Sequence, residues 1–326
     1  MPPPLAAVGV DVGGTKCLGV VLDAGGAVTA EHRVPTPATA EGLLSAVIDV
    51  VARLVPDGQP GSVGVGLPGL VDRDGVLQFV PNLPGITDVP VRAALEARFP
   101  GASVRVDNDA NCAAWAEHID GAATGRDHAI MITLGTGIGG GIIIDGRLFR
   151  GAHGLAGELG HMVVDPHGPP CPCGQRGCWE RFASGSGLGR LGREAAHAGR
   201  VPRVLELAGG DPENVRGEHV TAAAAEGDNA AAAVMADFAW WLGLGLANLA
   251  NAFDPEIFVV GGGLVEAGPV LMDPLRAAFH QLLEADEHRP DIAVVPATLG
   301  EHAGAIGAAR LAAGKNLRID RKTPAE

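Results

Sequence analysis

Cysteine and basic side chains are both scarce in this sequence. Its 326 residues include five cysteines, and 24 lysines and arginines stand against 38 aspartates and glutamates, which gives a formal net charge of −14 at pH 7. Nucleic-acid-binding proteins usually present basic patches that neutralise phosphates, so this balance argues against a broad nucleic-acid surface. An odd number of cysteines, with no secretory segment before them, argues against a disulfide framework.

A signal segment and a membrane-length apolar run are also missing. The first four residues, MPPP, form neither a basic n-region nor an apolar h-region, so we expect a cytoplasmic protein. The longest apolar helical pattern, Phe238 to Phe253, is interrupted by Gly243 and Asn248 and falls short of the ~18–20 apolar residues that span a bilayer. We therefore predict a buried helix there and no membrane partner. The composition, 47% hydrophobic and 19% charged, is typical of a compact soluble enzyme.

The cysteines that are present form a pattern with one histidine. Nine residues separate His161 from Cys171, one separates Cys171 from Cys173, and four separate Cys173 from Cys178. Three thiolates and one imidazole are the donors of a closed tetrahedral zinc site, and four protein ligands leave no open position for substrate. We therefore predict a structural Zn²⁺ ion, with Cys17 and Cys112 as small core residues.

Two glutamates flank this pattern. Glu158 lies three residues before His161, and Glu180 lies two residues after Cys178, so a metal that fixes its ligands also fixes both carboxylates. A carboxylate accepts several hydrogen bonds and can bind two neighbouring hydroxyls of a sugar. Without other motifs, two solvated loop charges would be the better explanation of the pair.

Two glycine-rich turns each lie between apolar stretches that alternate like strands. The first, in VGVDVGGTKCLGVVLD, contains Asp11, Gly13, Gly14, Thr15 and Lys16, and the second contains Gly135, Thr136 and Gly137. Glycines that admit close approach, a hydroxyl and a cation suit a bound phosphate, and Asp11 suits hydrated Mg²⁺. Two such hairpins indicate an internal duplication.

A third glycine cluster, Gly261, Gly262 and Gly263, follows an apolar strand at 257–260, where the N-terminus of a helix can receive a nucleotide. The sequence Asp107-Asn108-Asp109-Ala110-Asn111 ends another strand and begins a helix that we expect to run to Glu117. One helix cap needs one such residue, and this stretch supplies four. A carboxylate here can accept the proton of a hydroxyl that attacks phosphorus.

These motifs, DVGGTK, LPG at 67–69, DNDAN, GTGIGGG, GELGH and CPCGQRGCWE, occur in an order that resembles the ROK family of sugar kinases and repressors, over residues 8–314. Within that family the chain looks like a bacterial ATP-dependent glucokinase. The resemblance implies that Asp109 is the catalytic base in the transfer of the γ-phosphoryl group of Mg-ATP to the 6-hydroxyl of glucose. The residues implied around the sugar are Asn108, Asp109, Glu158, His161 and Glu180, together with Gly69 and Asn82.

The family also implies a fold. It consists of two α/β lobes of the actin and hexokinase type, ribonuclease H-like, with mixed sheets and a central cleft. A chain of this length favours two domains on size alone. We expect a small lobe at 1–107 plus 302–326, and a large lobe at 108–301 that carries the zinc-bound sugar loop. A homodimer or homotetramer is typical of the family.

Several alternatives stay open at this stage. Fructose, mannose, N-acetylglucosamine and N-acetylmannosamine present related hydroxyls to the same carboxylates, and polyphosphate could replace ATP as the donor. Repressors of the family carry a DNA-binding domain before the phosphate hairpin, which here begins at about residue 8. A sugar-sensing regulator without that domain is the remaining alternative to an enzyme.

Overall fold

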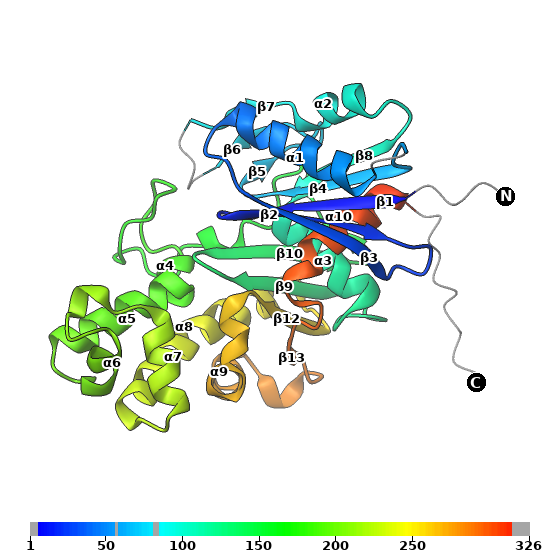
Figure 1. Ribbon diagram of the computed structural model, residues 1–326. Helices are drawn as coiled ribbons and strands as arrows, with labels where there is room; N and C mark the ends of the chain where they lie inside the picture. The colour runs from blue at the N-terminus through cyan, green and yellow to red at the C-terminus, as the bar shows by residue number, and fades with distance from the viewer. Residues whose placement is uncertain (1–5, 56–57, 81–84, 315–326) are drawn as a thin grey trace. The chain divides into compact units, whose positions relative to one another are not determined.

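The chain divides into two compact units. The computed structural model describes residues 6–55, 58–80 and 85–314, coloured by position in Figure 1. Unit 1 comprises Met1–Ala116, Gly151–Leu155 and Glu301–Glu326, and unit 2 comprises Glu117–Arg150 and Ala156–Gly300.

Unit 1 is built around a five-stranded mixed sheet in the order β3-β2-β1-β4-β8. Three antiparallel strands come first, and two parallel strands follow them on the other side of β1. A small second sheet has the order β5-β6-β7. The strands are β1 (Ala7–Val12), β2 (Lys16–Leu22), β3 (Val28–Pro35), β4 (Ser62–Leu67), β5 (Leu70–Val71), β6 (Leu77–Phe79), β7 (Thr87–Val89) and β8 (Ser103–Asn108).

Helices cover both faces of this sheet (Figure 1). The helix α1 (Ala40–Leu54) begins at Thr39, whose hydroxyl accepts a hydrogen bond from Gly42 N, and it buries an apolar stripe against the core. The helix α2 (Val91–Arg98) packs near β8. On the opposite face, α10 (Ala303–Ala313) lies directly on Gly9 and Gly64, where a Cβ atom would overlap the helix backbone.

The boundary between the units differs from the predicted one at residues 107 and 108. The helix α3 (Asp109–Asp120) belongs to unit 1 as far as Ala116, because a Cβ on Gly307 of α10 would overlap the carbonyl oxygen of Cys112. The backbones of α3 and α10 therefore touch. Residues 151–155 also belong to unit 1, since Arg73 N donates to His153 O at 3.3 Å and the Arg73 guanidinium donates to Gly151 O.

Unit 2 repeats the architecture of unit 1. Its mixed sheet has the order β11-β10-β9-β12-β13, again with antiparallel strands on one side of the central strand and parallel strands on the other. This shared order is what the two glycine hairpins predict from a duplication. The strands are β9 (Ala129–Leu134), β10 (Ile138–Ile144), β11 (Arg147–Leu148), β12 (Ile257–Gly261) and β13 (Ala293–Pro296).

The long helix α8 (Asn229–Phe253) forms the centre of the core of unit 2. By length and composition it is the one helix among the described residues that could span a membrane, which differs from the sequence estimate because the helix extends nine residues before Phe238. Its packing is that of a core helix. Gly245 lies against the ring of Trp179, and Gly243 lies against the backbone of α9 (Pro269–Leu282). The prediction of a buried helix is thus confirmed.

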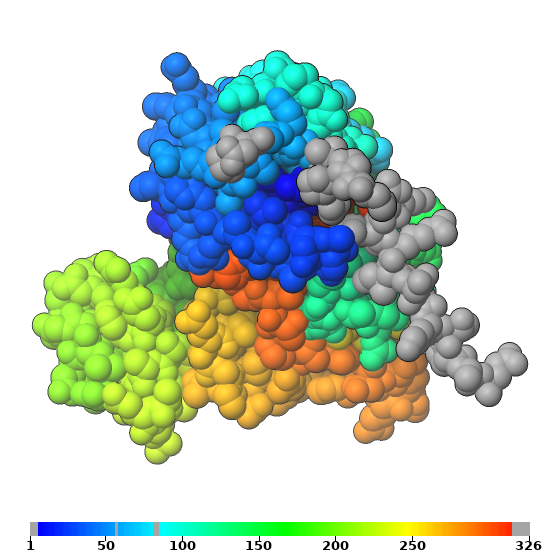
Figure 2. Space-filling model, turned by 45° about the vertical axis from the view of Figure 1, so that its right-hand side comes forward, coloured from blue at the N-terminus to red at the C-terminus, as the bar shows by residue number. Residues whose placement is uncertain are grey.

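The remaining helices of unit 2 form a block beside this core, shown in yellow-green in Figure 2. They are α4 (Glu180–Ala183), α5 (Gly185–His197), α6 (Pro202–Leu207) and α7 (Gly217–Ala225). Short 3₁₀ helices complete the chain: η1 (Leu159–His161), η2 (Pro212–Asn214), η3 (Gly263–Ala267), η4 (Asp286–His288) and η5 (Gly300–His302).

The buried carboxylate of Glu117 closes unit 2. It accepts hydrogen bonds from Ala122 N at 2.7 Å, from Thr298 N at 2.9 Å and from Leu299 N at 2.8 Å, and from the Thr298 hydroxyl at 3.1 Å. Four donors satisfy a buried charge that would otherwise be costly. Glu117 thereby joins segments 181 positions apart in the chain.

Candidate functional site

The turn between β1 and β2 presents a polar edge of unit 1. Gly13 N donates to Lys16 O at 2.9 Å, and the Thr36 hydroxyl donates to Gly13 O at 2.7 Å, so the turn has a fixed shape. Gly14, Thr15 and Lys16 are exposed. A Cβ on Gly14 would meet nothing within 4 Å, which leaves open space above the turn. The Lys16 ammonium is 2.5 Å from Glu301 Oε2, in a pair that is itself exposed.

Behind this turn lies a carboxylate without a partner. Asp11 Oδ1 is inaccessible to solvent and has no hydrogen-bond partner among the described residues. Burial raises the pKa of Asp11 to about 7, with a further increase from the Asp109 charge and a partial decrease from Lys16. Glycines provide the room, since a Cβ on Gly304 would lie 2.6 Å from Asp11 Cγ. An orphaned carboxylate oxygen of this kind fits a hydrated cation such as Mg²⁺.

Asp109 begins α3 at the end of β8, in the same unit as Asp11. Its Oδ1 accepts a hydrogen bond from Ala110 N at 2.8 Å. A Cβ on Gly66, in the neighbouring strand β4, would lie 3.3 Å from Asp109 Cα and 3.4 Å from Asp11 Oδ1. The charge of Asp109 disfavours a second negative charge on Asp11, which favours either a proton or a bound cation there.

The rest of the DNDAN motif holds Asn108 in place. Asn108 Oδ1 accepts from Asn111 N at 3.1 Å, and Asn108 Nδ2 donates to Gly69 O at 3.2 Å. Asn111 Nδ2 in turn donates to Asp107 Oδ1 at 2.9 Å. Gly69 has a φ of 88°, and a Cβ there would overlap Phe79 O. The structure therefore brings Gly69 and Asn108 together, whereas Asn82 lies outside the described residues.

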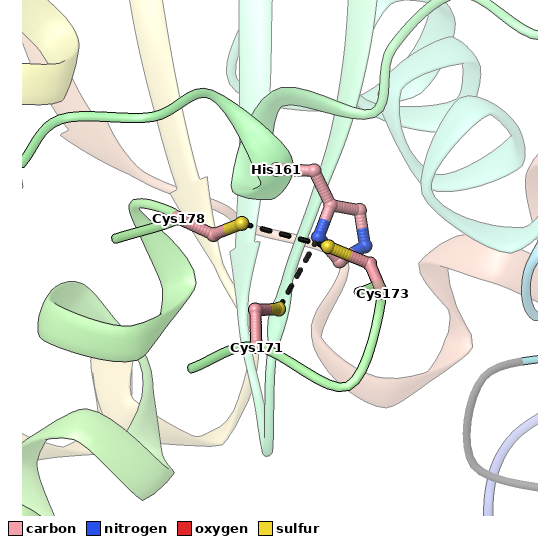
Figure 3. A group of neighbouring side chains, drawn as sticks. All are labelled: His161, Cys171, Cys173 and Cys178. Atoms are coloured by element: carbon pink, nitrogen blue, oxygen red, sulfur yellow. Dashed lines mark hydrogen bonds between the residues drawn. The ribbon is translucent and has the colours of Figure 1, made fainter. Parts of the chain in front are cut away.

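The four predicted metal ligands converge in unit 2 (Figure 3). The ligand atoms of His161, Cys171, Cys173 and Cys178 all lie within 4.8 Å of one another. Cys171 Sγ is 3.7 Å from His161 Nδ1, and Cys173 Sγ is 3.6 Å from Cys178 Sγ. A zinc tetrahedron with Zn–S bonds of ~2.3 Å has edges of about 3.8 Å, so the donor set fits the ion. All five cysteines are free thiols, and 3.6 Å is far from a disulfide bond.

Backbone hydrogen bonds shape the loop that carries these ligands. Cys171 N donates to Gln175 O at 2.8 Å, and Gly174 N donates to Cys171 O at 3.0 Å, which forms a tight turn between Cys171 and Cys178. His153 and His167, the other histidines near this segment of the sequence, are not part of the cluster.

Both flanking glutamates lie beside His161. Glu158 Oε2 is 3.9 Å from His161 Nε2, and Glu180 Oε1 is 3.8 Å from His161 Nδ1. The Cys171 thiol donates to Glu180 Oε1 at 3.1 Å. Burial raises the pKa of Glu158, His161 lowers it in part, and the charge of Glu180 raises it further. The arrangement gives two fixed acceptors on either side of an imidazole, which suits a polyhydroxylated ligand.

The turn between β9 and β10 borders a large cavity of unit 2. The cavity has a volume of about 820 Å³ and lies between this turn, η3, α5 and α7. Gly135, Thr136 and Gly263 line it, but Gly137, Gly261 and Gly262 do not. Gly261 is buried at the end of β12, and a Cβ on Gly262, whose φ is 85°, would overlap Leu134 O.

Only three of the 17 residues that line this cavity were predicted from the sequence. Sequence reasoning overlooked the glycines of α5 and the basic residues Arg193 and Arg216. Arg193 also donates to Val215 O at 2.9 Å, which fixes the chain before α7. The signal was the sequence Gly-Ser-Gly-Leu-Gly at 185–189, a glycine run at a helix start. The α-helix expected after Gly263 is instead the five-residue 3₁₀ helix η3, and α9 begins only at Pro269.

The chain is similar over almost its whole length to known glucokinases. It is 42% identical to a glucokinase of Streptomyces coelicolor over 312 residues, covering 94% of this chain and 96% of that protein. It is 37% identical to a glucokinase of Thermotoga maritima, covering 95% and 98%. The solved structure of a ROK family glucokinase from Streptomyces griseus, in complex with glucose and AMPPNP, matches with a TM-score of 0.84 and 42% identity, covering 94% of this chain and 98% of that one.

The architecture of each unit and these matches agree on a mixed α/β fold of the actin-like hexokinase type. The model of the ROK family matches residues 7–315, almost the whole described chain. This protein belongs to the ROK family.

Proposed function

We propose that this protein phosphorylates glucose at the 6-hydroxyl with Mg-ATP, giving glucose 6-phosphate and ADP. The chain is an ATP-dependent kinase of the hexokinase type, as its glucokinase relatives support. The observation that carries the choice of a sugar is the pair Glu158 and Glu180, held on either side of His161 by one ligand cluster.

In the proposed reaction Asp109 accepts the proton of the 6-hydroxyl as that oxygen forms a bond to the γ-phosphorus. The bond from the γ-phosphorus to the bridging oxygen breaks, and ADP leaves with the electron pair. A general base of this kind contributes about 10²–10⁴-fold. Glu158, His161 and Glu180 would bind and orient the sugar hydroxyls, together with Asn108 and Gly69.

The cavity of unit 2 would hold the nucleotide. Its glycine-lined wall admits close approach of a flat base. The lining also holds two arginines, Arg193 and Arg216, and two glutamates, Glu218 and Glu266; the guanidinium groups would pair with phosphate oxygens. The exposed turn at Gly13–Lys16 would bind phosphate oxygens.

Two ions complete the proposal. Asp11 would hold Mg²⁺ through water, and the ion would neutralise charge on the phosphates. His161, Cys171, Cys173 and Cys178 would hold Zn²⁺, which would brace the sugar loop. The thiols must lose their protons to bind zinc, although burial raises the pKa of Cys171 and Cys178 in the absence of the ion.

The test is ADP release by the purified protein with Mg-ATP and each of glucose, fructose, mannose, N-acetylglucosamine and N-acetylmannosamine. Asp109→Asn serves as the control. We expect the highest kcat/KM with glucose, and a loss of turnover in the variant. Preference for another sugar would overturn the substrate assignment, and turnover with polyphosphate in place of ATP would overturn the donor assignment. Tight sugar binding without turnover would identify a sensor.

A further inference from the structure

The glycines of the β9–β10 turn have different surroundings. A Cβ on Gly135 would meet nothing within 4 Å. A Cβ on Gly137 would lie 2.6 Å from Glu180 Oε2 and 3.7 Å from Glu180 Cδ, closer than real Cβ atoms approach an oxygen. Gly137 does not have a positive φ. Glycine is therefore required at position 137 by the nearby Glu180 carboxylate and not by the backbone conformation.

The same turn is tied to both ends of α4. Glu180 begins the helix with its carboxylate over Gly137, and Gly185 N, just beyond the helix, donates to Gly135 O at 2.8 Å. The turn is closed by its own hydrogen bond, from Gly135 N to Gly137 O at 3.1 Å. Glu180 and the turn are thus held in one fixed relation by a helix of four residues.

Other groups confine the Glu180 carboxylate on the remaining sides. Cys171 Sγ is 3.1 Å from Oε1, and His161 Nδ1 is 3.8 Å from the same atom. The side chain of Glu180 is only 17% exposed. Oε2 therefore stands where the empty space above Gly137 allows it to stand.

Gly140, in the strand β10 that follows the turn, has different surroundings. A Cβ on Gly140 would lie 2.7 Å from Gly157 O and 2.6 Å from Leu159 Cδ1, so a side chain there would push the backbone of the GELGH segment. At Gly137 the neighbour is the end of a flexible side chain. A methyl group at 137 would consequently move one carboxylate and leave the fold intact.

We propose that Gly137 is a positioning residue of the sugar site, whose missing Cβ sets the place of the Glu180 carboxylate. The turn is thereby shared: Gly135 and Thr136 face the nucleotide cavity, and Gly137 faces the sugar carboxylate. This inference rests on the proposed function, and it moves Gly137 from the phosphate contacts, where the sequence analysis puts it, to the sugar contacts.

The experiment compares Gly137→Ala with Gly135→Ala in steady-state kinetics, with glucose and ATP varied separately. Gly137→Ala should raise the KM for glucose about tenfold and change the KM for ATP less than threefold. Gly135→Ala, two residues away in the same turn, should raise the KM for ATP and leave the KM for glucose nearly unchanged. A Gly137→Ala enzyme with a raised KM for ATP and an unchanged KM for glucose would overturn the proposal.

A second background separates positioning from general damage. Glu180→Asp withdraws the carboxylate by about 1.5 Å, one carbon–carbon bond, and so removes the contact with residue 137. In that background Gly137→Ala should change the KM for glucose less than twofold, a strong departure from additivity. An equal tenfold effect in both backgrounds would overturn the proposal. If Gly137→Ala alone does not fold, recovery of folding in the double variant supports the contact, and a double variant that also fails to fold overturns it.

The wild-type enzyme distinguishes this failure from failure of the proposed function. If wild-type protein turns over glucose with ATP while the variants behave contrary to expectation, only the role of Gly137 is overturned. If wild-type protein does not phosphorylate glucose, the proposed function fails first.

Discussion

The two glycine hairpins stand at equivalent places in two sheets of the same strand order, yet they carry different chemistry. In unit 1 the turn joins the pair Val12 and Cys17, and in unit 2 it joins Leu134 and Ile138. The first has Asp11 behind it, whose Oδ1 is inaccessible to solvent, and Lys16 on its edge. The second contains no charged residue and borders the cavity and the Glu180 carboxylate.

This difference indicates that the two copies of a duplicated fold can carry different groups of functional residues. The charges that suit a metal ion and a proton transfer, Asp11 and Asp109, lie in unit 1. The cavity and the two glutamates that we propose to bind the sugar, Glu158 and Glu180, lie in unit 2. Changes in unit 1 should therefore alter kcat, and changes in the loop of unit 2 should alter the KM for glucose.

Asp109→Asn, in unit 1, should have the largest effect on activity. The amide keeps the shape of the side chain but cannot accept the hydroxyl proton, so kcat should fall about 10²–10⁴-fold. Binding of glucose, measured by calorimetry, should stay within about tenfold. Near-normal turnover would refute the assignment of Asp109 as the base.

Cys173→Ala should act on unit 2 alone. We expect loss of zinc by metal analysis and a KM for glucose raised about tenfold. Tm should fall by about 5–10 °C, which corresponds to a loss of about 2.5 kcal/mol at about 2–4 °C per kcal/mol for domains of 150–250 residues. Cys17→Ala removes a buried cysteine outside the cluster; this control variant should keep its zinc. Wild-type protein without zinc would contradict the prediction.

Asp11→Asn should stabilise the protein at high pH when divalent cations are absent. The pKa of Asp11 is raised from 3.8 to about 7, so the folded wild type loses stability as the pH rises between these values. Above pH 7 the variant should gain about 2 kcal/mol, half of what 1.36 kcal/mol per unit would give, because the side chain is partly accessible. Below pH 4 the two proteins should unfold alike.

Urea unfolding at several pH values measures this gain, and added Mg²⁺ supplies the control. Magnesium should stabilise wild type more than Asp11→Asn, since the ion compensates the buried charge. Equal stability of both proteins at pH 8, with or without magnesium, would show that Asp11 carries no such cost.

Glu301→Gln should have the smallest effect. Hydrogen bonds from Lys16 and Arg33 lower the pKa of Glu301 to about 2, so its contribution is present above pH 4.5 and is lost as the pH falls through 2. The side chains are exposed, so Tm at pH 7 should fall by no more than a few degrees. If the KM for ATP rises while Tm stays nearly unchanged, Glu301 holds Lys16 in position for the proposed phosphate contact.

Local patterns predicted much of this molecule because they depend on neighbours in the chain. The spacing of His161, Cys171, Cys173 and Cys178 is sufficient to bring four donors together, and the alternation around residues 11–16 is sufficient for a hairpin. The sheets and the buried helix α8 follow from apolar periodicity in the same way.

Contacts between distant segments were beyond such patterns. Nothing near Gly137 in the chain indicates that Glu180 occupies the space above it. Arg193 and Arg216 reach the cavity only because α5 and α7 pack side by side. The boundary inside α3 depends on its contact with α10, about 195 residues later, which a reading of composition along the chain does not register.

The carboxylate of Glu117 gives the second unit the topology of a closed ring. The segment from Glu117 to Gly300, which contributes only residues 151–155 to unit 1, has its first residue hydrogen-bonded to residues 298 and 299, close to its last. A segment whose ends already meet can be inserted into a surface loop, or cut and rejoined elsewhere, at little cost in chain entropy. The hydrogen bonds of one buried side chain thus make the segment that contains unit 2 suitable for insertion into another protein or for circular permutation.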